Sequence, residues 1–344
     1  MTFSVSGRYR GRRIEPISDY FSMELRIDID QIEQSCHVCR CISWDLTEFY
    51  DSGEEACANK ISCSSWVIRS PEILTGAAAT EIYGTASGLG TSAEIQACIK
   101  IIRNDSILIA DVALSGENNI DRYQCSWHSS FFHDADLQID VCKNVAFEPV
   151  LPEYQISGDK VLTLESVYAE AGICLSVSRQ GLVSTRRRPW LPDGLHLAMH
   201  QHFHSLSESP QWQLWGLVAN RFHQSDTAGI MFSQAESRTS LPAQRGFAVF
   251  REHESFAGLK PGSEGLEREE AAKRYLHTFV HEIGHAFNLQ HSWEKGRPDA
   301  LSWMNTAGRY DKRNGKGSFW RDFEFQFDHE EIVKLRHGWL DAAI

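Results

Sequence analysis

Residues 277–291 read His-Thr-Phe-Val-His-Glu-Ile-Gly-His-Ala-Phe-Asn-Leu-Gln-His, and this stretch decides how the second half of the chain is interpreted. His281 and His285 are four residues apart, so on a helix they lie one turn above the other and can bind one metal ion. Glu282 follows directly and can reach a water molecule at that ion without being a ligand. His291 comes six residues after His285, so it reaches the same point only if the helix ends and the chain turns back.

The residues around this motif predict a long helix over about 266–287. On a helical wheel, several apolar side chains lie within about 60° of Leu276; they are Ala272, Phe279, Val280, Ile283 and Phe287. The two histidines and Glu282 fall on the other side, so the apolar face can contact a core while the polar face borders a cleft. Asn288 follows, and Asn is one of the few non-glycine residues that tolerate the left-handed conformation that ends a helix.

A methionine, Met304, comes 13 residues after His291, within Ser-Trp-Met-Asn. The histidine motif and this methionine together resemble the metzincin clan of zinc metalloproteases, which carry HExxHxxGxxH followed by a Met-turn. Asn288 stands where the family has glycine, so this is an HExxHxxNxxH variant. The resemblance is strong over 277–305 and looser over about 135–344, and it does not cover the first 130 residues.

The resemblance implies a metalloendopeptidase, an enzyme that hydrolyses peptide bonds through a metal-activated water. It implies a Zn²⁺ ion bound by three ligands, His281, His285 and His291. It makes Glu282 the general base and Met304 a hydrophobic floor that does not coordinate the metal.

A tyrosine two residues after the methionine assists the transition state in some family members. Here that position is Thr306, and the nearest tyrosine, Tyr310, is the candidate for this role. Two alternatives stay open. Glu324 or Glu330 would be the third ligand in a related class of metallopeptidases. A zinc-stabilised, proteolytically silent binding module would keep the same fold, although a purely structural site needs no base such as Glu282.

The expected substrate is a protein or peptide bound in an extended conformation along an edge of the sheet. By family analogy this edge strand comes shortly before the active-site helix, and two segments are candidates, 228–232 and 246–250. The sequence does not choose between them.

The chain is expected to contain two domains. Apolar and polar residues alternate at about 23–29, 38–46, 61–68, 93–102 and 106–114, which predicts an all-β sandwich over 1–132. We expect this domain to serve recognition or regulation, for example by binding a partner protein. Residues 133–344 are expected to form the α/β metzincin-like zinc protease domain, with a twisted mixed sheet, an active-site helix and a Met-turn.

Charge and hydropathy restrict the partners. The chain has 34 Lys and Arg against 46 Asp and Glu, a net charge of −12, which argues against nucleic-acid binding because that needs a basic surface. No stretch approaches the roughly 18 consecutive apolar residues of a membrane span. Residues 1–15 are polar and rich in arginine, without the apolar region of a secretory signal. We therefore expect a cytoplasmic protein, and export by a route that needs no signal peptide stays open.

Overall fold

The computed structural model describes residues 4–15, 17–30, 34–44, 60–76, 78–88, 94–104, 107–116, 120–143, 145, 150–157, 160–184, 189–203, 212–233 and 245–338. The chain divides into two compact units, Met1–Phe132 and His133–Ile344. Each unit has its own hydrophobic core.

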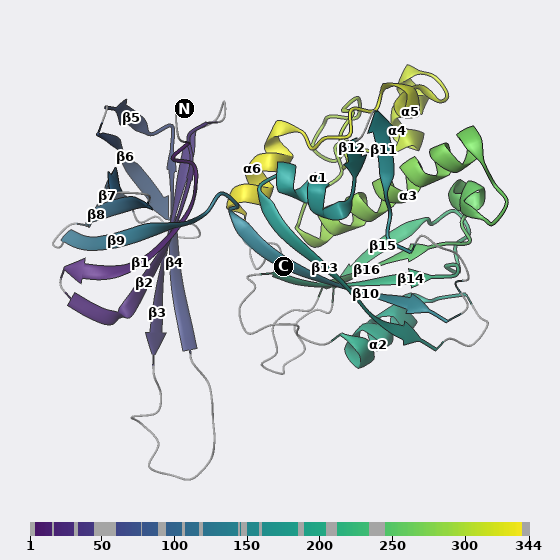
Figure 1. The fold of residues 1–344 in the computed structure, drawn as a ribbon, viewed down its shortest axis with the longest axis horizontal. Coiled ribbons are helices and arrows are strands. Elements are labelled where there is room, and N and C mark those ends of the chain that lie inside the picture. The colour runs from purple at the N-terminus through teal and green to yellow at the C-terminus, as the bar shows by residue number, and fades with distance from the viewer. Residues whose placement is uncertain are drawn as a thin grey trace, which may run out of the picture. The chain divides into compact units, whose positions relative to one another are not determined.

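The described part of the first unit consists of antiparallel strands (Figure 1). They are β1 (Gly7–Glu15), β2 (Ile17–Asp28), β3 (Ser35–Trp44), β4 (Lys60–Arg69), β5 (Glu72–Thr75), β6 (Ala79–Gly88), β7 (Glu94–Asn104), β8 (Ile107–Ser115) and β9 (Ile120–Ser129). Their order is β4-β3-β2-β1-β9-β8-β7-β6-β5, and a further pairing of β4 with β6 closes eight of them into a ring.

The first unit is therefore a closed antiparallel β-barrel, and the predicted sandwich is wrong. The prediction failed because alternation of apolar and polar residues marks a strand with one buried face, and a barrel and a sandwich both contain such strands. Closure depends on which strands pair. β4 is joined to β6 by the pairs Trp66–Gly88 and Ile68–Ala86. The inward side chains form one core, which includes Leu25, Val38, Ile68, Ile82, Ile99, Val112 and Tyr123.

The second unit contains a mixed, mostly parallel sheet in the order β13-β10-β14-β16-β15 (Figure 1). Its strands are β10 (His133–Cys142), β13 (Ile173–Val183), β14 (Trp212–Ala219), β15 (Gly229–Ser233) and β16 (Arg245–Phe250). Only β15 runs antiparallel to its neighbour, β16, and it lies at the edge. A separate hairpin pairs β11 (Tyr154–Ser157) with β12 (Lys160–Leu162).

Helices cover both faces of this sheet. They are α1 (Leu164–Glu170), α2 (Pro192–His202), α3 (Gly265–Ala286), α4 (Ala307–Asn314), α5 (Ser318–Asp322) and α6 (His329–His337), with a short 3₁₀ turn η2 (Glu254–Leu259). Alternate residues of β14 enter different cores: Leu214 and Val218 pack with α1 and α3, whereas Trp215 and Leu217 pack with α2. The burial of both faces explains why β14 is apolar along its length.

The predicted helix over 266–287 is present as α3, and its predicted apolar face is the buried one. Leu276, Phe279, Val280 and Ile283 have no exposed surface. Among the described residues no helix is both long and apolar enough to cross a membrane.

Gly11 offers a test of the barrel. A Cβ atom there would lie 1.9 Å from the carbonyl oxygen of Gln124 on β9. We therefore expect Gly11→Ala to lower the free energy of unfolding by about 3 kcal/mol, the upper range for overpacking, because backbone atoms must move apart. The matched control is Gly116→Ala, since a Cβ at Gly116 meets no atom within 4 Å. Urea unfolding followed by circular dichroism measures both, and equal midpoints would contradict the close approach of β1 and β9.

Candidate metal centre

Helix α3 ends in a tight turn that reverses the chain. Asn288 has φ 67°, the left-handed conformation that its residue type was predicted to allow. Its N–H donates to the carbonyl of His285 at 2.9 Å, and the N–H of Leu289 donates to the carbonyl of Gly284 at 3.0 Å. These two bonds define a Schellman motif, which satisfies the last carbonyl groups of a helix. Arg245 on β16 donates to the carbonyl of Ala286 at 2.9 Å and holds the helix end against the sheet.

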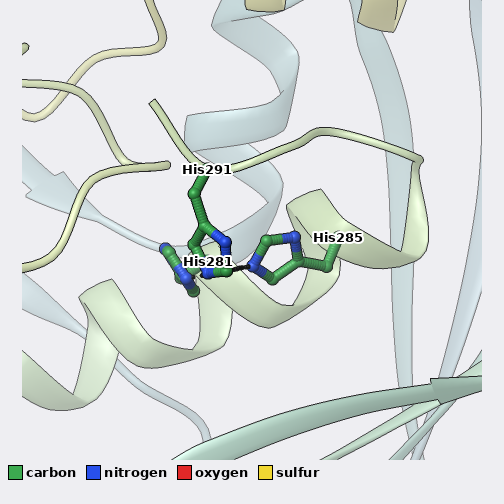
Figure 2. A group of neighbouring side chains, drawn as sticks. All are labelled: His281, His285 and His291. Atoms are coloured by element: carbon green, nitrogen blue, oxygen red, sulfur yellow. Dashed lines mark hydrogen bonds between the residues drawn. The ribbon is translucent and has the colours of Figure 1, made fainter. Parts of the chain in front are cut away.

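The reversal brings the three predicted histidines together (Figure 2). His285 Nε2 lies 3.1 Å from His281 Nε2 and 3.0 Å from His291 Nε2. One ligand nitrogen from each ring lies within 4.8 Å of the other two. His281 is buried, whereas His285 and His291 are partly buried and border the open side of the cluster.

The outer nitrogens of the two helical rings are held by carbonyl acceptors, and that of His291 lies close to a carboxylate. His281 Nδ1 lies 2.8 Å from the carbonyl oxygen of Trp303, and His285 Nδ1 lies 2.7 Å from that of Leu289. His291 Nδ1 lies 3.0 Å from Glu294 Oε2. Carbonyl and carboxylate oxygens only accept hydrogen bonds, so the Nδ1 atoms carry the protons. This arrangement is the one that fixes the tautomer of metal-binding histidines in known sites.

The rings stay neutral, so each carries one proton. Because that proton is on Nδ1, the facing Nε2 atoms carry none. Burial lowers the pKa of His285 to about 4 and also lowers those of His281 and His291. Repulsion from neighbouring imidazoles adds to the shift of His281 and His285, whereas Glu294 opposes the shift of His291. The three Nε2 atoms therefore direct lone pairs at one another, which is unfavourable unless a cation lies between them. Tetrahedral Zn–N bonds of about 2.0–2.1 Å place ligand nitrogens about 3.3 Å apart, close to the separations found. The residues present thus fit a zinc ion.

Glu282 lies beside this cluster in a buried position. Burial raises the pKa of its carboxyl group to about 8, and a hydrogen bond from the backbone of Met231 opposes the shift. The backbone of β15 passes directly against it, because a Cβ at Gly229 would lie 2.8 Å from Glu282 Oε1 and 2.7 Å from Thr278 Cγ2. Only glycine lets the edge strand approach the carboxyl group so closely.

One edge of the sheet is formed by β15, which overlaps the first of the two candidate segments, 228–232. The second segment, 246–250, lies inside the sheet as β16. The N–H of Phe250 donates to the carbonyl of Ala228, so in this antiparallel ladder every second residue from Ala228 bonds to β16. Met231 belongs to the alternate set, whose backbone groups point outward to the side where Glu282 lies.

Met304 is fully buried below the helix. A Cβ at Gly284, between the two helical histidines, would lie 2.4 Å from Met304 Sδ. The turn that carries the methionine also carries the carbonyl of Trp303, which holds His281. A larger residue at position 284 would therefore push this sulfur away from the helix.

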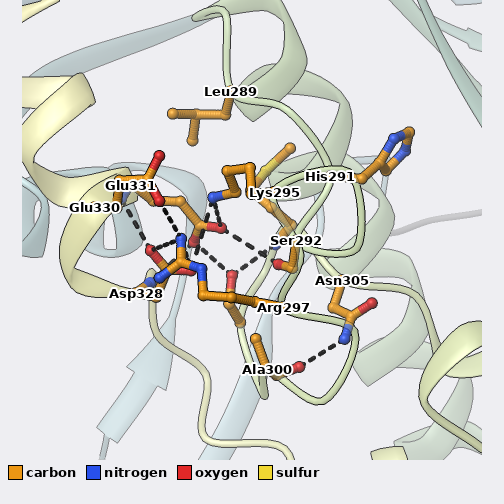
Figure 3. A network of polar contacts seen from close by, with 12 residues as sticks. Leu289, His291, Ser292, Lys295, Arg297, Ala300, Asn305, Asp328, Glu330 and Glu331 are labelled. Atoms are coloured by element: carbon orange, nitrogen blue, oxygen red, sulfur yellow. Dashed lines mark hydrogen bonds and ion pairs between the residues drawn. The ribbon is translucent and has the colours of Figure 1, made fainter.

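A buried polar network supports the segment that carries His291 (Figure 3). At its centre is Glu331 of α6, which has no exposed surface and accepts from Lys295 Nζ at 2.8 Å and from Ser302 Oγ. The N–H of Ser292 donates to the carbonyl of Met304 at 3.1 Å. These contacts tie together the turn after α3, the methionine turn and the last helix.

The other candidate residues lie elsewhere. Tyr310 is buried in the core, with its ring 5.6 Å from that of Phe319, so its predicted role in the transition state stays a prediction. Glu330 pairs with Arg297 at 2.7 Å, and Glu324 accepts a hydrogen bond from Gln326.

His277, one turn before His281, is outside the metal-binding group. Its ring is stacked on that of His281 with centroids 5.6 Å apart. Its remaining ring neighbours are aromatic: Trp303, Phe319, Trp320 and Phe323. Burial lowers the pKa of His277 to about 3, although its ring also bonds to the backbone of Asn305.

Several residues of the site were not predicted from the sequence. Gly229 and Met231 belong to a strand remote in sequence, and Glu331 acts from the last helix. Glu294 had a local signal, since it comes three residues after His291.

Comparison with models of known protein families gives no match, and comparison with curated protein sequences gives none either.

The pH dependence of stability provides a test of the buried position of His277. Its imidazole stays neutral in the folded protein down to about pH 3, whereas in the unfolded chain it binds a proton below about pH 6.5. The unfolded state therefore holds more protons between these values, and stability falls as the pH is lowered through this window. In metal-free protein, His277→Phe should reduce this slope by up to about 1.4 kcal/mol per pH unit. Urea unfolding at pH 7, 6 and 5 measures it, and parallel slopes for the two proteins would contradict the neutral buried ring.

Proposed function

We propose that the chain is a zinc-dependent endopeptidase of the metzincin type. One observation carries the proposal: three neutral imidazoles point unprotonated nitrogens at one point, and the residue after the first of them is a buried glutamate. A structural zinc site has four protein ligands, whereas a catalytic site has three and keeps a position for water. The three-histidine group and Glu282 match the second description.

His281, His285 and His291 would hold the ion through their Nε2 atoms. When bound, zinc would lower the pKa of a water molecule towards about 7 and polarise a peptide carbonyl. Glu282 takes the proton of that water and delivers it to the leaving amine. Burial raises the pKa of its carboxyl group in the empty site, and a bound cation would lower it again, which would leave a carboxylate that can accept the proton. Met304 keeps the underside of the site apolar, and Tyr310 is the candidate for assistance to the transition state.

The substrate would bind as an extended strand along β15. Its backbone groups would pair with the outward N–H and C=O groups of this edge strand, which is the usual mode of strand addition. The N–H of Met231 is already engaged by Glu282, so a strand added along the rest of this edge would lie beside the proposed base. Residues 133–344 would thus form the protease domain, and the barrel in 1–132 would serve recognition or regulation, for example through a partner protein.

A second candidate is a zinc-stabilised binding module that does not cleave peptides. The burial of Glu282 next to the histidines favours the enzyme, because a carboxyl group that neither binds metal nor pairs with a cation is costly to bury. Measuring metal content and cleavage on the same samples separates the two.

Glu282→Gln tests the base. The variant keeps the shape of the side chain and the three ligands, so it should bind about one zinc per chain, as the wild type does. Cleavage of casein or of a peptide library should fall by about 10²–10⁴-fold, the usual contribution of general acid–base catalysis. Equal cleavage by both proteins would remove Glu282 from this role.

His291→Ala tests the third ligand. Zinc affinity should fall by more than the 10- to 100-fold loss seen when only an outer partner of a ligand is removed. Competition with a chelator, read out by metal analysis, measures it. The control is His200→Ala on α2, an exposed histidine outside the cluster. Unchanged zinc retention in His291→Ala would favour a different third ligand.

A further inference from the structure

The open side of the histidine cluster carries an unusual stack of side chains. The imidazole of His291 lies on the indole of Trp293, with centroids 3.8 Å apart and an angle of 18° between the planes. The guanidinium of Arg309, from the first turn of α4, lies over the same indole at 5.2 Å from its centroid. An exposed arginine is thus connected to a candidate metal ligand through one aromatic ring.

Arg309 differs from the neighbouring arginines in its partners. Arg297, Arg313 and Arg321 each pair with a carboxylate, at 2.7 to 2.9 Å. Within the described part of the chain, the side-chain contact of Arg309 is with the face of Trp293, and no ion pair is found for it. Cation–π contact fixes the position of a guanidinium but leaves its five N–H donors available.

The surrounding charges leave this cation effective. The nearby carboxylate of Glu294 is engaged by His291, through Nδ1 at 3.0 Å and the backbone N–H at 3.1 Å. The chain as a whole carries a net charge of −12. A guanidinium without an ion pair at the rim of the cluster is therefore a positive site on an acidic protein.

We infer that Arg309, held on Trp293, is a specificity-determining residue that binds a carboxylate of the peptide substrate. This inference rests on the proposed peptidase function. Guanidinium and carboxylate match as bidentate partners, which gives geometric selection as well as charge. The carboxylate belongs either to a Glu or Asp side chain or to the free C-terminus of the substrate.

The experiment uses the full chain loaded with zinc and a peptide that the wild type cleaves. At each position in turn the peptide carries Glu, Gln or Lys, and each version is made with a free acid and with an amide at its C-terminus. Wild type should cleave one Glu peptide about 5- to 10-fold better than its Gln counterpart, mainly through KM. A preference for the free acid over the amide would assign the carboxylate to the C-terminus instead. Either preference should weaken as salt is added.

The variants are Arg309→Ala, Arg309→Glu and a matched control, Arg313→Ala. Arg313 lies one turn later on the same helix, is exposed, and pairs with Asp299. Arg309→Ala should abolish the ratio between acidic and neutral peptides, Arg309→Glu should turn it towards Lys peptides, and Arg313→Ala should preserve it. A ratio that survives in Arg309→Ala, or no acidic preference in the wild type, would overturn the inference.

Binding separates this inference from the proposed function. Anisotropy of fluorescein-labelled peptides gives Kd for zinc-loaded Glu282→Gln with and without Arg309→Ala. In one outcome the wild type cleaves no peptide, yet acidic peptides bind and their binding requires Arg309. The peptidase proposal then fails and the carboxylate site stands. If peptides are cleaved but neither assay depends on Arg309, the peptidase stands and the site fails.

Discussion

The mutual repulsion of three imidazole lone pairs is the constraint on which the second unit depends. The Nδ1 atoms of His281 and His285 are committed to carbonyl groups, so their Nε2 atoms meet at 3.1 Å without a proton between them. Without a cation between them, holding these nitrogens with their lone pairs facing one another is unfavourable. The surrounding packing must therefore supply the free energy that keeps the rings together, and a bound cation would return it as affinity.

Most of that packing comes from residues after the helix. Helix α3 presents two of the rings, whereas the groups that orient them come from the turn at Leu289 and from Trp303. The buried carboxylate of Glu331 joins these segments to α6, far along the chain. The geometry of the cluster thus depends on segments as far along the chain as α6, and local unfolding of α6 would remove the contacts of Glu331 with Lys295 and Ser302.

The sequence predicted the parts of this site that are local in the chain. Spacing indicated the three histidines, helical periodicity indicated the buried face of α3, and the residue type of Asn288 indicated where the chain reverses. The contact of Gly229 with Glu282 could not be predicted, because it depends on which strand forms the edge of the sheet. A glycine in a strand marks a close approach but does not name the neighbour.

Strand pairing was also beyond the sequence in the first unit, and the barrel closure has a consequence of its own. β4 meets β6 through three residue pairs, Trp66–Gly88, Val67–Ser87 and Ile68–Ala86, and this short pairing closes the ring. β5 lies beside β6, at the other end of the strand order from β4. Closure at these three positions uses backbone groups that an open sheet would leave at its edge, so it shortens the edge to which another chain could add a strand.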